Sequence, residues 1–315
     1  MRLRALAMGA IVVVLVSASA CDDASSPETS GGTGATETSP PTGSPEATTV
    51  VVVPADVTAK DYDPSFFDDS SHVVDNEWFP LRPGTQYVYR GSTLEGKERI
   101  HHKAVFTVTD LTKVVDGVRT IMIWDRDYTA GELVEAELAM FAQDVAGNIW
   151  HFGQYPEEYD NGKFDKAPAW VAGFEGARPG ITIKAEPHPG APSYSQGYAP
   201  PPLNWVDRAR VYRVGQETCV PLGCYQDVLV TEEFERTKPG AFQLKYYAPG
   251  VGNVRVGWRG RNEEEQETLV LVDLIELDAE ELAEARAGAL QLDENGYERA
   301  EGSWGQTPPP EQLEA

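Results

Sequence analysis

Cys219 and Cys224 are the residues of the folded region whose spacing most directly predicts chemistry. Four residues separate them, including Pro221 and Gly223, and apolar runs flank the segment on both sides. This spacing fits the tip of a β-hairpin, where the two Cβ atoms come within reach of each other. Outside the cytoplasm the pair is expected to form a disulfide. The alternative is a metal site, which needs about two more ligands, and no histidine lies nearby in the sequence.

Asp125 and Asp127 open a second pattern, which resembles the start of a calcium-binding loop. The EF-hand template requires a glycine at position six and a glutamate at position twelve. This chain has Ala130 and Ala136 at those positions. We therefore expect a hairpin with a polar face in this segment, and no metal site.

The histidines offer no metal-ligand spacing. His101 and His102 are adjacent, and side chains alternate across a strand, so the two point to opposite faces and cannot easily bind one ion together. His72, His151 and His188 are isolated in the sequence. Any of them could meet a carboxylate only in the fold.

No signature of nucleophilic catalysis is present in the sequence. The Gly-x-Ser-x-Gly elbow is absent, and Ser193 and Ser195 lie in a loop without a strand-turn-helix context. There is no Gly-rich phosphate loop and no dinucleotide fingerprint. The chain contains 50 Asp and Glu residues, so paired carboxylates are not diagnostic. The sequence assigns no catalytic residue and no cofactor.

Residues 1–20 have the features of a signal peptide. Arg2 and Arg4 precede an apolar run from Leu6 to Val16, and small residues follow it up to Ala20. The apolar run is shorter than the roughly 20 residues that span a bilayer. We therefore expect export rather than a permanent membrane helix.

Cys21 follows directly and makes the stretch resemble a bacterial lipobox, although Ala18 stands where lipoproteins more often carry Leu or Val. The parity of the three cysteines favours lipidation, because a Cys219–Cys224 pair leaves Cys21 as the odd thiol. A lipid there would hold the protein on the outer face of the cell membrane. The alternative is cleavage by an ordinary signal peptidase and secretion.

The net charge of −24 excludes classes of partner. Nucleic acid needs a basic face, and anionic lipid head groups need a polybasic segment. Residues 263–315 hold much of the negative charge, and a solvated acidic tail explains that without a special function.

The chain divides by composition into four parts. Residues 1–20 are the signal peptide, and residues 21–54 combine the lipid-attachment cysteine with a disordered Ser/Thr/Pro/Gly linker. Residues 55–277 are expected to form a β-rich globular domain. Residues 278–315 are expected to form an acidic helix and a disordered tail, with Asp278 and Glu281 at capping-box spacing and a Pro-rich end from Gly302.

The β-rich region alternates apolar runs with short turns such as Asp116-Gly117 and Ala130-Gly131, which is typical of hairpins. We predict a mainly β fold, antiparallel, with a strongly curved sheet or open barrel, one C-terminal helix and a Pro-rich flap at residues 154–206. The predicted strands are Gln86–Gly91, Lys103–Asp110, Arg119–Tyr128, Glu132–Gln143, Asn148–Phe152, Gly180–Lys184, Arg208–Glu217, Cys224–Phe234, Phe242–Ala248, Asn253–Trp258 and Thr268–Glu276.

Three segments carry a resemblance to a known group of proteins: Asn76–Thr85, Phe141–Gly153 and Lys245–Gly252. Together they resemble a family of uncharacterised exported proteins and lipoproteins common in high-GC Gram-positive bacteria. The resemblance implies a location and no activity. More loosely, the Tyr-Ala-Pro-Gly-Val-Gly stretch is similar to exported β-rich proteins, some of which look like the half-open barrel of lipoprotein carriers.

Two classes of function remain open from the sequence. The first is a non-enzymatic envelope lipoprotein, a monomer that binds a small or apolar ligand or a partner on its sheet face or under the flap. The second is an extracytoplasmic hydrolase whose residues meet only in the fold. An apolar cavity of roughly several hundred Å³ would favour the first. A cleft that gathers His151 or His188 with carboxylates would favour the second. A filled interior with neither feature would leave a structural role.

Overall fold

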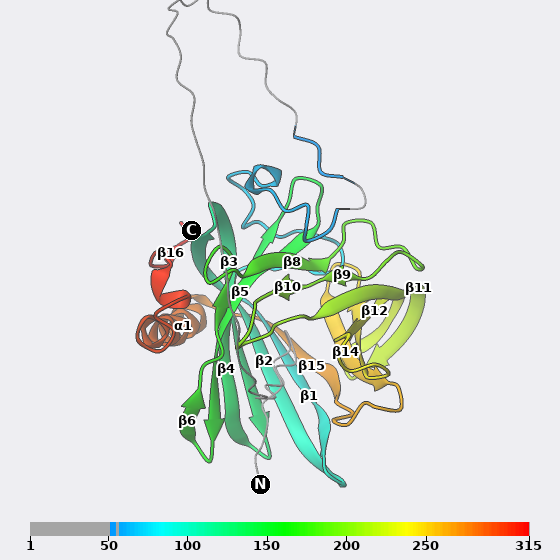
Figure 1. The fold of residues 1–315 in the computed structure, drawn as a ribbon. Helices are drawn as coiled ribbons and strands as arrows, with labels where there is room; N and C mark the ends of the chain where they lie inside the picture. Colours follow the sequence, from blue (N-terminus) through cyan, green and yellow to red (C-terminus); the bar gives the residue numbers. More distant parts are fainter. Residues whose placement is uncertain (1–50, 55–56, 315) are drawn as a thin grey trace, which may run out of the picture.

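The computed structural model describes residues 51–54 and 57–314, and its main feature is one antiparallel sheet that curls into a nearly closed barrel (Figure 1). The strands follow one another in the order β10-β8-β5-β4-β3-β2-β1-β15-β14-β13-β12-β11-β9. Three short strands pair at the side, β6 and β7 with β5, and β16 with β2. The predicted fold class is confirmed.

The eleven predicted strands are all present, most of them longer than predicted. The strands are β1 (Thr85–Glu95), β2 (Glu98–Val115), β3 (Val118–Thr129), β4 (Glu132–Gln143), β5 (Ile149–Asp160), β6 (Lys163–Lys166), β7 (Trp170–Val171), β8 (Arg178–Ile183), β9 (Tyr194–Ser195), β10 (Gly197–Tyr198), β11 (Arg208–Val220), β12 (Gly223–Phe234), β13 (Phe242–Ala248), β14 (Gly252–Arg259), β15 (Thr268–Glu276) and β16 (Glu311–Gln312).

The central strands bury both of their faces, because the barrel has one core inside and a second core outside. In β3, Ile121 and Ile123 belong to the inner core, whereas Met122 belongs to the outer core and Trp124 packs against it. This explains why β3 and β4 each contain a continuous apolar run, Ile121–Trp124 and Leu138–Ala142, instead of a simple alternation of apolar and polar residues.

The turns between these strands follow from residues that accept positive φ. Asp116 and Gly117 have φ of 50° and 81°, and Ala130 and Gly131 have φ of 53° and 91°. Positive φ at both central residues is the geometry of a two-residue type I′ hairpin. Both hairpins predicted from the sequence are therefore confirmed.

The Pro-rich flap differs from its predicted limits. Residues up to Asp160 continue β5, so the flap begins later than residue 154. Its short strands close most of the gap in the barrel, because β10 pairs with β8 and β9 pairs with β11. Trp170 and Trp205 pack together within the flap, with ring centroids 5.6 Å apart.

The C-terminal helix α1 (Ala279–Arg299) lies against the outside of β2 and β4. Asp278 caps its N-terminus, and a capping box with Glu281 is formed as predicted. Gly288 allows close approach to the sheet, since a Cβ there would lie 2.4 Å from the ring of Trp124.

The prediction of a frayed tail after Gly302 is wrong. Trp304 is fully buried, and its indole Nε1 donates a hydrogen bond to Asp293 at 2.8 Å. Further on, Arg119 contacts Glu311 at 2.7 Å where β16 pairs with β2. A single large aromatic side chain supplies enough buried surface to order this segment, which composition alone did not reveal.

Cys219 and Cys224 are joined by a disulfide at the tip of the β11–β12 hairpin, with their Cα atoms 4.0 Å apart. Cys21 and the predicted signal peptide lie outside the described residues. Within the described part of the chain, no helix is both long and apolar enough to span a membrane.

Candidate functional site

The interior of the barrel changes from apolar to charged along its axis. On the inner face of β3, Ile121 and Ile123 are followed by Asp125 and Asp127, and all four are buried. On β4 the buried pair Ala139 and Phe141 is preceded by the buried pair Glu135 and Glu137. The charged half therefore lies toward the Ala130-Gly131 turn.

Register places these acids directly opposite one another. Asp125 pairs with Glu137 and Asp127 pairs with Glu135, after a bulge between Asp127 and Tyr128. Like charges in directly opposite positions of a sheet are destabilising. A continuous two-residue hairpin without this bulge would instead set Asp127 opposite Val134. The bulge thus brings four carboxylates to one face.

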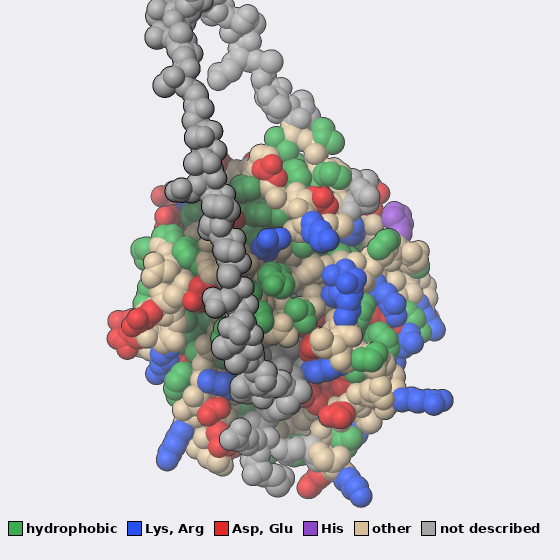
Figure 2. All heavy atoms as spheres, viewed as in Figure 1, with side chains coloured by type: hydrophobic (Ala, Val, Ile, Leu, Met, Phe, Trp, Pro, Cys, Tyr) green, Lys and Arg blue, Asp and Glu red, His purple; other side chains and the backbone are tan. Residues whose placement is uncertain are grey.

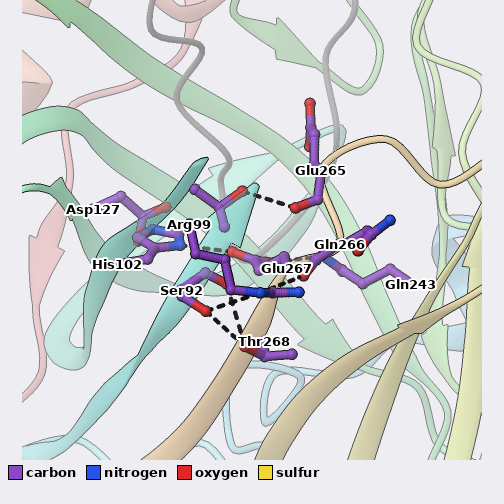
Figure 3. Close-up of polar contacts among 10 residues, drawn as sticks. Ser92, Arg99, His102, Asp127, Gln243, Glu265, Gln266, Glu267 and Thr268 are labelled. Carbon is purple, nitrogen blue, oxygen red and sulfur yellow. Dashed lines mark hydrogen bonds and ion pairs between the residues drawn. The ribbon is translucent and has the colours of Figure 1, made fainter. Parts of the chain in front are cut away.

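His102 lies between two of the carboxylates that face the interior (Figure 3). Its Nδ1 is 2.8 Å from Glu267 Oε1, and its Nε2 is 3.6 Å from Asp127 Oδ1. His102 pairs with Gly91 on β1, and β1 lies between β2 and β15. A Cβ at Gly91 would lie 1.7 Å from the carbonyl oxygen of Thr268, so the glycine lets the backbone of β15 approach β1 closely next to Glu267.

The pKa values of this group follow from burial and from the neighbouring charges. Burial alone would lower the pKa of His102, but Asp127 and Glu267 outweigh it and raise the pKa to about 11. Burial raises the pKa of Asp127 to about 6, against the opposing effect of His102. His102 is therefore a buried cation that neutralises one of its two carboxylate neighbours.

Among the described residues, no ion pair joins the other three carboxylates to a cation, although Lys245 lowers the pKa of Glu137 in part. Burial and neighbouring carboxylates raise the pKa of Asp125, Glu135 and Glu137 well above their usual range. Glu137 accepts a hydrogen bond from Gln154 Nε2 at 2.7 Å. Asp125 accepts one from the backbone N–H of Arg126 at 2.9 Å. These contacts only partly replace the water that the carboxylates have lost.

The opposite wall of the charged half contains the second buried cation. Lys245 is 2.8 Å from Glu233 Oε2, and Gln196 of the flap donates to Glu233 Oε1 at 3.0 Å. Gln243 donates to Glu267 Oε2 at 2.7 Å. The flap therefore contributes to the polar interior as well as closing the barrel.

An interior cavity of about 40 Å³ lies where the apolar and charged halves meet. A volume of roughly 10–15 Å³ holds one water, so this space equals about three waters. One part of its wall is aromatic and another part carries polar and charged groups. The wall includes Phe79, Tyr87, Tyr89, Phe106, Phe141, Tyr247, Asp125, Glu137, His151, Gln196 and Lys245.

His151 contributes a neutral ring to this wall. Burial lowers its pKa to about 3. The ring stacks on Phe141 with centroids 4.9 Å apart, and Nε2 lies 3.1 Å from the carbonyl oxygen of Gly153. His151 therefore lines the same cavity as Asp125 and Glu137, whereas His188 is exposed beside Glu186.

A wider groove of about 430 Å³ lies under the flap. It is mostly apolar, with Trp170, Phe174 and the run Pro200–Leu203 in its wall. Its size is within the range of small-molecule sites, which the interior cavity is not. The two spaces differ in chemistry, because the carboxylates Asp125 and Glu137 line the interior cavity and the groove has one, Glu175.

The outer face of the barrel has the opposite charge in one region. Figure 2 shows Lys and Arg side chains over the side where Figure 1 draws β11 and β12. Arg210 and Arg259 both bind the fully buried Glu232 there. Arg213 lies over Tyr212, 4.7 Å from the ring centroid. On this face the buried acid is matched by cations.

The sequence-based site predictions have three outcomes. The Cys219–Cys224 disulfide is present, and Cys21 lies outside the described residues. His101 is exposed and His102 is buried, as strand alternation predicted. In the part of the chain that the structure describes, no three His, Cys, Asp or Glu side chains are grouped so that they could hold a metal ion.

The interior carboxylates were not predicted. Their signal is two acids spaced by one residue next to an apolar run, in two consecutive strands of one hairpin. The segments on which the family resemblance rests also point here. Phe79 comes from the first, Phe141 and His151 from the second, and Lys245 and Tyr247 from the third, and all of them line the cavity.

The fold and this interior define a mainly β, nearly closed antiparallel barrel with a charged half. No family model and no curated protein matches the chain. The family resemblance therefore stays a prediction.

Two solved structures are similar to the barrel. One is a protein from Bacteroides fragilis NCTC 9343, predicted to be exported and described as having a YmcC-like fold, with 14% identity and a TM-score of 0.38. The aligned region covers 64% of this chain and 99% of that protein's chain. The other is a predicted lipoprotein from Parabacteroides distasonis ATCC 8503, with 13% identity, a TM-score of 0.36, and coverage of 64% and 100%. Both TM-scores are below 0.5, so the site must be interpreted from its own residues.

Proposed function

We propose that this chain is a non-enzymatic binding protein of the cell envelope that holds a small ligand inside the barrel. The observation that carries the proposal is the interior cavity, which has aromatic rings on one part of its wall and buried, incompletely neutralised carboxylates on another. A binding site of this kind combines an apolar surface with a few convergent polar groups that fix the orientation of the ligand.

Stability alone gives no reason to keep these carboxylates inside the barrel. Asp125, Glu135 and Glu137 are each at most 5% exposed. Buried charges are costly, and well-packed apolar residues of similar volume are often equally or more stabilising. A ligand that interacts with the carboxylates would offset this cost, and the offset would contribute to its affinity.

The location proposed for the protein is the outer face of the cell membrane, where a lipid on Cys21 anchors it. The signal-peptide features of residues 1–20 and the odd cysteine support this location. The Cys219–Cys224 disulfide suits an oxidising compartment. The linker of residues 21–54 would then separate the anchor from the barrel.

One observation favours the second candidate, an extracytoplasmic hydrolase. Asp125 and Glu137 lie opposite each other and line the same cavity as His151, and a carboxyl group with a raised pKa can act as a general acid. The cavity, however, has the volume of about three waters, which is too small for a scissile group together with both of its substituents. Binding therefore accounts for the interior better than hydrolysis does.

The test is mass spectrometry of the protein purified from its native envelope, first under native and then under denaturing conditions. We expect an added mass that is lost on denaturation, and a diacylglycerol mass on the peptide that contains Cys21. Ala139→Leu, which fills the cavity, should lose the first mass. The control Ala287→Leu, on the exposed side of α1, should keep it.

Each part of the proposal has an outcome that contradicts it. Equal native and denatured masses for the unmodified protein would contradict interior binding. A Cys21→Ser variant that stays on the membrane would contradict the lipid anchor. The ligand released from the native protein could be an ester, amide or glycoside. Hydrolysis of that ligand by the wild type but not by Glu137→Gln would establish the hydrolase instead.

A further inference from the structure

The charged half of the barrel has more hydrogen-bond acceptors than donors. Its side chains include six buried carboxylates and two cations, His102 and Lys245; the carboxylates are those of Asp125, Asp127, Glu135, Glu137, Glu233 and Glu267. His102 contacts Asp127 and Glu267, and Lys245 contacts Glu233. Asp125, Glu135 and Glu137 thus have neither of these cations as an ion-pair partner in the described part of the chain.

A second observation, independent of charge, points to the same deficit. Gln154 is fully buried, its Nε2 donates to Glu137, and its Oε1 accepts no hydrogen bond from any described residue. An orphaned buried acceptor is costly, so Gln154 Oε1 requires a donor.

The cavity places the deficit beside an aromatic surface. Asp125 and Glu137 line it directly, and Phe79, Phe106 and Tyr247 line it too. Aromatic faces attract cations as well as alkyl groups, through the negative potential of the ring. A ligand that satisfies both parts of the wall carries N–H donors and a positive charge next to a short apolar group.

We propose that the barrel interior binds a small organic ammonium group, either a short primary amine in its protonated form or the ammonium end of a larger molecule. The inference rests on the proposed binding function and specifies its ligand. The ammonium donates to Asp125 and Glu137, and the carbon next to it packs against the aromatic rings. A volume equal to about three waters accommodates an ammonium and one or two methylene groups.

Small probes test the requirement for a charged N–H donor. Ethylammonium supplies charge and N–H donors, ethanol supplies an O–H donor without charge, and acetate has the opposite charge. Tetramethylammonium is a larger cation without N–H donors, and it reports any non-specific effect of positive charge. The measurements are calorimetric titration and thermal unfolding of the purified full-length mature protein at pH 7.5, with sodium chloride to keep the ionic strength constant.

We expect saturable binding of ethylammonium with a Kd on the order of 1–10 mM, the range that a ligand of three heavy atoms can reach. At 100 mM it should raise Tm by about 3–8 °C. Tetramethylammonium, ethanol and acetate should raise it by less than about 1 °C at equal ionic strength.

Variants test whether the interior carboxylates are responsible. Asp125→Asn, which keeps the shape of the side chain and removes its charge, should weaken ethylammonium binding at least about tenfold. Asp165→Asn, a matched substitution on the exposed strand β6, should leave the Kd unchanged. If Asp125→Asn does not fold, Ala139→Leu gives the same test by filling the cavity, and it should also abolish binding.

The outcomes separate this inference from the function on which it rests. Equal effects of ethylammonium and tetramethylammonium, or a Kd unchanged in both Asp125→Asn and Ala139→Leu, would overturn the ammonium assignment. A ligand released from the native protein that carries no positive charge would also overturn it, while the binding function stands. If no ligand is released and no probe binds, both the ammonium assignment and the binding function are overturned.

Discussion

The molecule buries charges at two sites, one on the outer and one on the inner side of the same sheet. The two sites differ in how well their charges are paired. Outside the barrel, Lys113 pairs one-to-one with Asp293, and both are nearly inaccessible. Lys113 Nζ also lies 4.5 Å from the ring centroid of Trp304. Inside the barrel, carboxylates face carboxylates across β3 and β4. The outer site pairs its charges one-to-one, whereas among the described residues the inner site has more carboxylates than cations.

Comparing the two sites distinguishes buried charges that hold the fold together from buried charges that a ligand would neutralise. The outer pair fixes α1 and the C-terminal segment on the sheet, and Trp304 completes its hydrogen bonding. The inner group leaves Gln154 Oε1 as an orphaned acceptor within the described residues. In our proposal, a bound ligand supplies the missing donor.

The largest expected effect comes from breaking the matched site. Asp293→Ala removes the partner of Lys113 and leaves a cation with a side chain that is 0% exposed. Breaking a buried ion pair in this way costs about 3–5 kcal/mol of the free energy of unfolding. Urea unfolding of Asp293→Ala against the wild type measures it. A loss below about 1 kcal/mol would mean that the pair does not hold α1.

The pH dependence of stability tests the mismatched site next. Burial raises the pKa of Asp127 to about 6 and raises those of Asp125, Glu135 and Glu137 still more clearly, so the folded state holds protons that the unfolded state has released. The raised pKa of His102, about 11, also makes the folded state less stable as the pH rises. The protonated His102 stabilises the fold fully below the unfolded pKa near 6.5, and this contribution is lost as the pH rises toward 11.

The sign is therefore a loss of stability with rising pH. His151 opposes it only below pH 6.5, because its lowered pKa keeps the folded ring neutral while the unfolded ring takes up a proton. We expect the free energy of unfolding at pH 5.5 to exceed that at pH 8.5 by at least about 2 kcal/mol. Urea titrations at both pH values and equal ionic strength measure the difference. Equal or greater stability at pH 8.5 would show that the interior carboxylates are neutralised within the chain.

Glu135→Gln is expected to stabilise the protein, by less than Asp293→Ala destabilises it. Glu135 faces Asp127 and Glu158 in register, and the amide removes a charge that burial and its neighbours disfavour. We expect a gain of about 1 kcal/mol in the free energy of unfolding at pH 8, and a smaller change at pH 5. A lower free energy of unfolding for Glu135→Gln at pH 8 would show that the charge of Glu135 is stabilised within the folded protein.

Much of the fold could be predicted from the sequence because its signals are local. Apolar runs between Gly-bearing turns located the eleven strands, and the capping box located the start of α1. The order of Trp304 could not be predicted, because it depends on a pocket that Tyr155 and Asp293 form only after the helix has packed.

The site could be predicted only in part, and the reason is register. The histidine alternation and the disulfide follow from neighbours in sequence. The acid pairs depend on the bulge between Asp127 and Tyr128, since one residue of slip exchanges the two faces of a strand. The His102–Glu267 contact joins positions that are far apart in sequence and meet only because β1 pairs with both β2 and β15.

The most direct test of the central claim is a crystal structure of the protein grown with 2-bromoethylammonium, whose bromine is located by anomalous scattering. We predict a bromine peak beside Phe79 and Phe106 inside the barrel, with the nitrogen within hydrogen-bond distance of Asp125 and Glu137. A bromine peak only in the groove under the flap, or a nitrogen directed away from both carboxylates, would contradict the account.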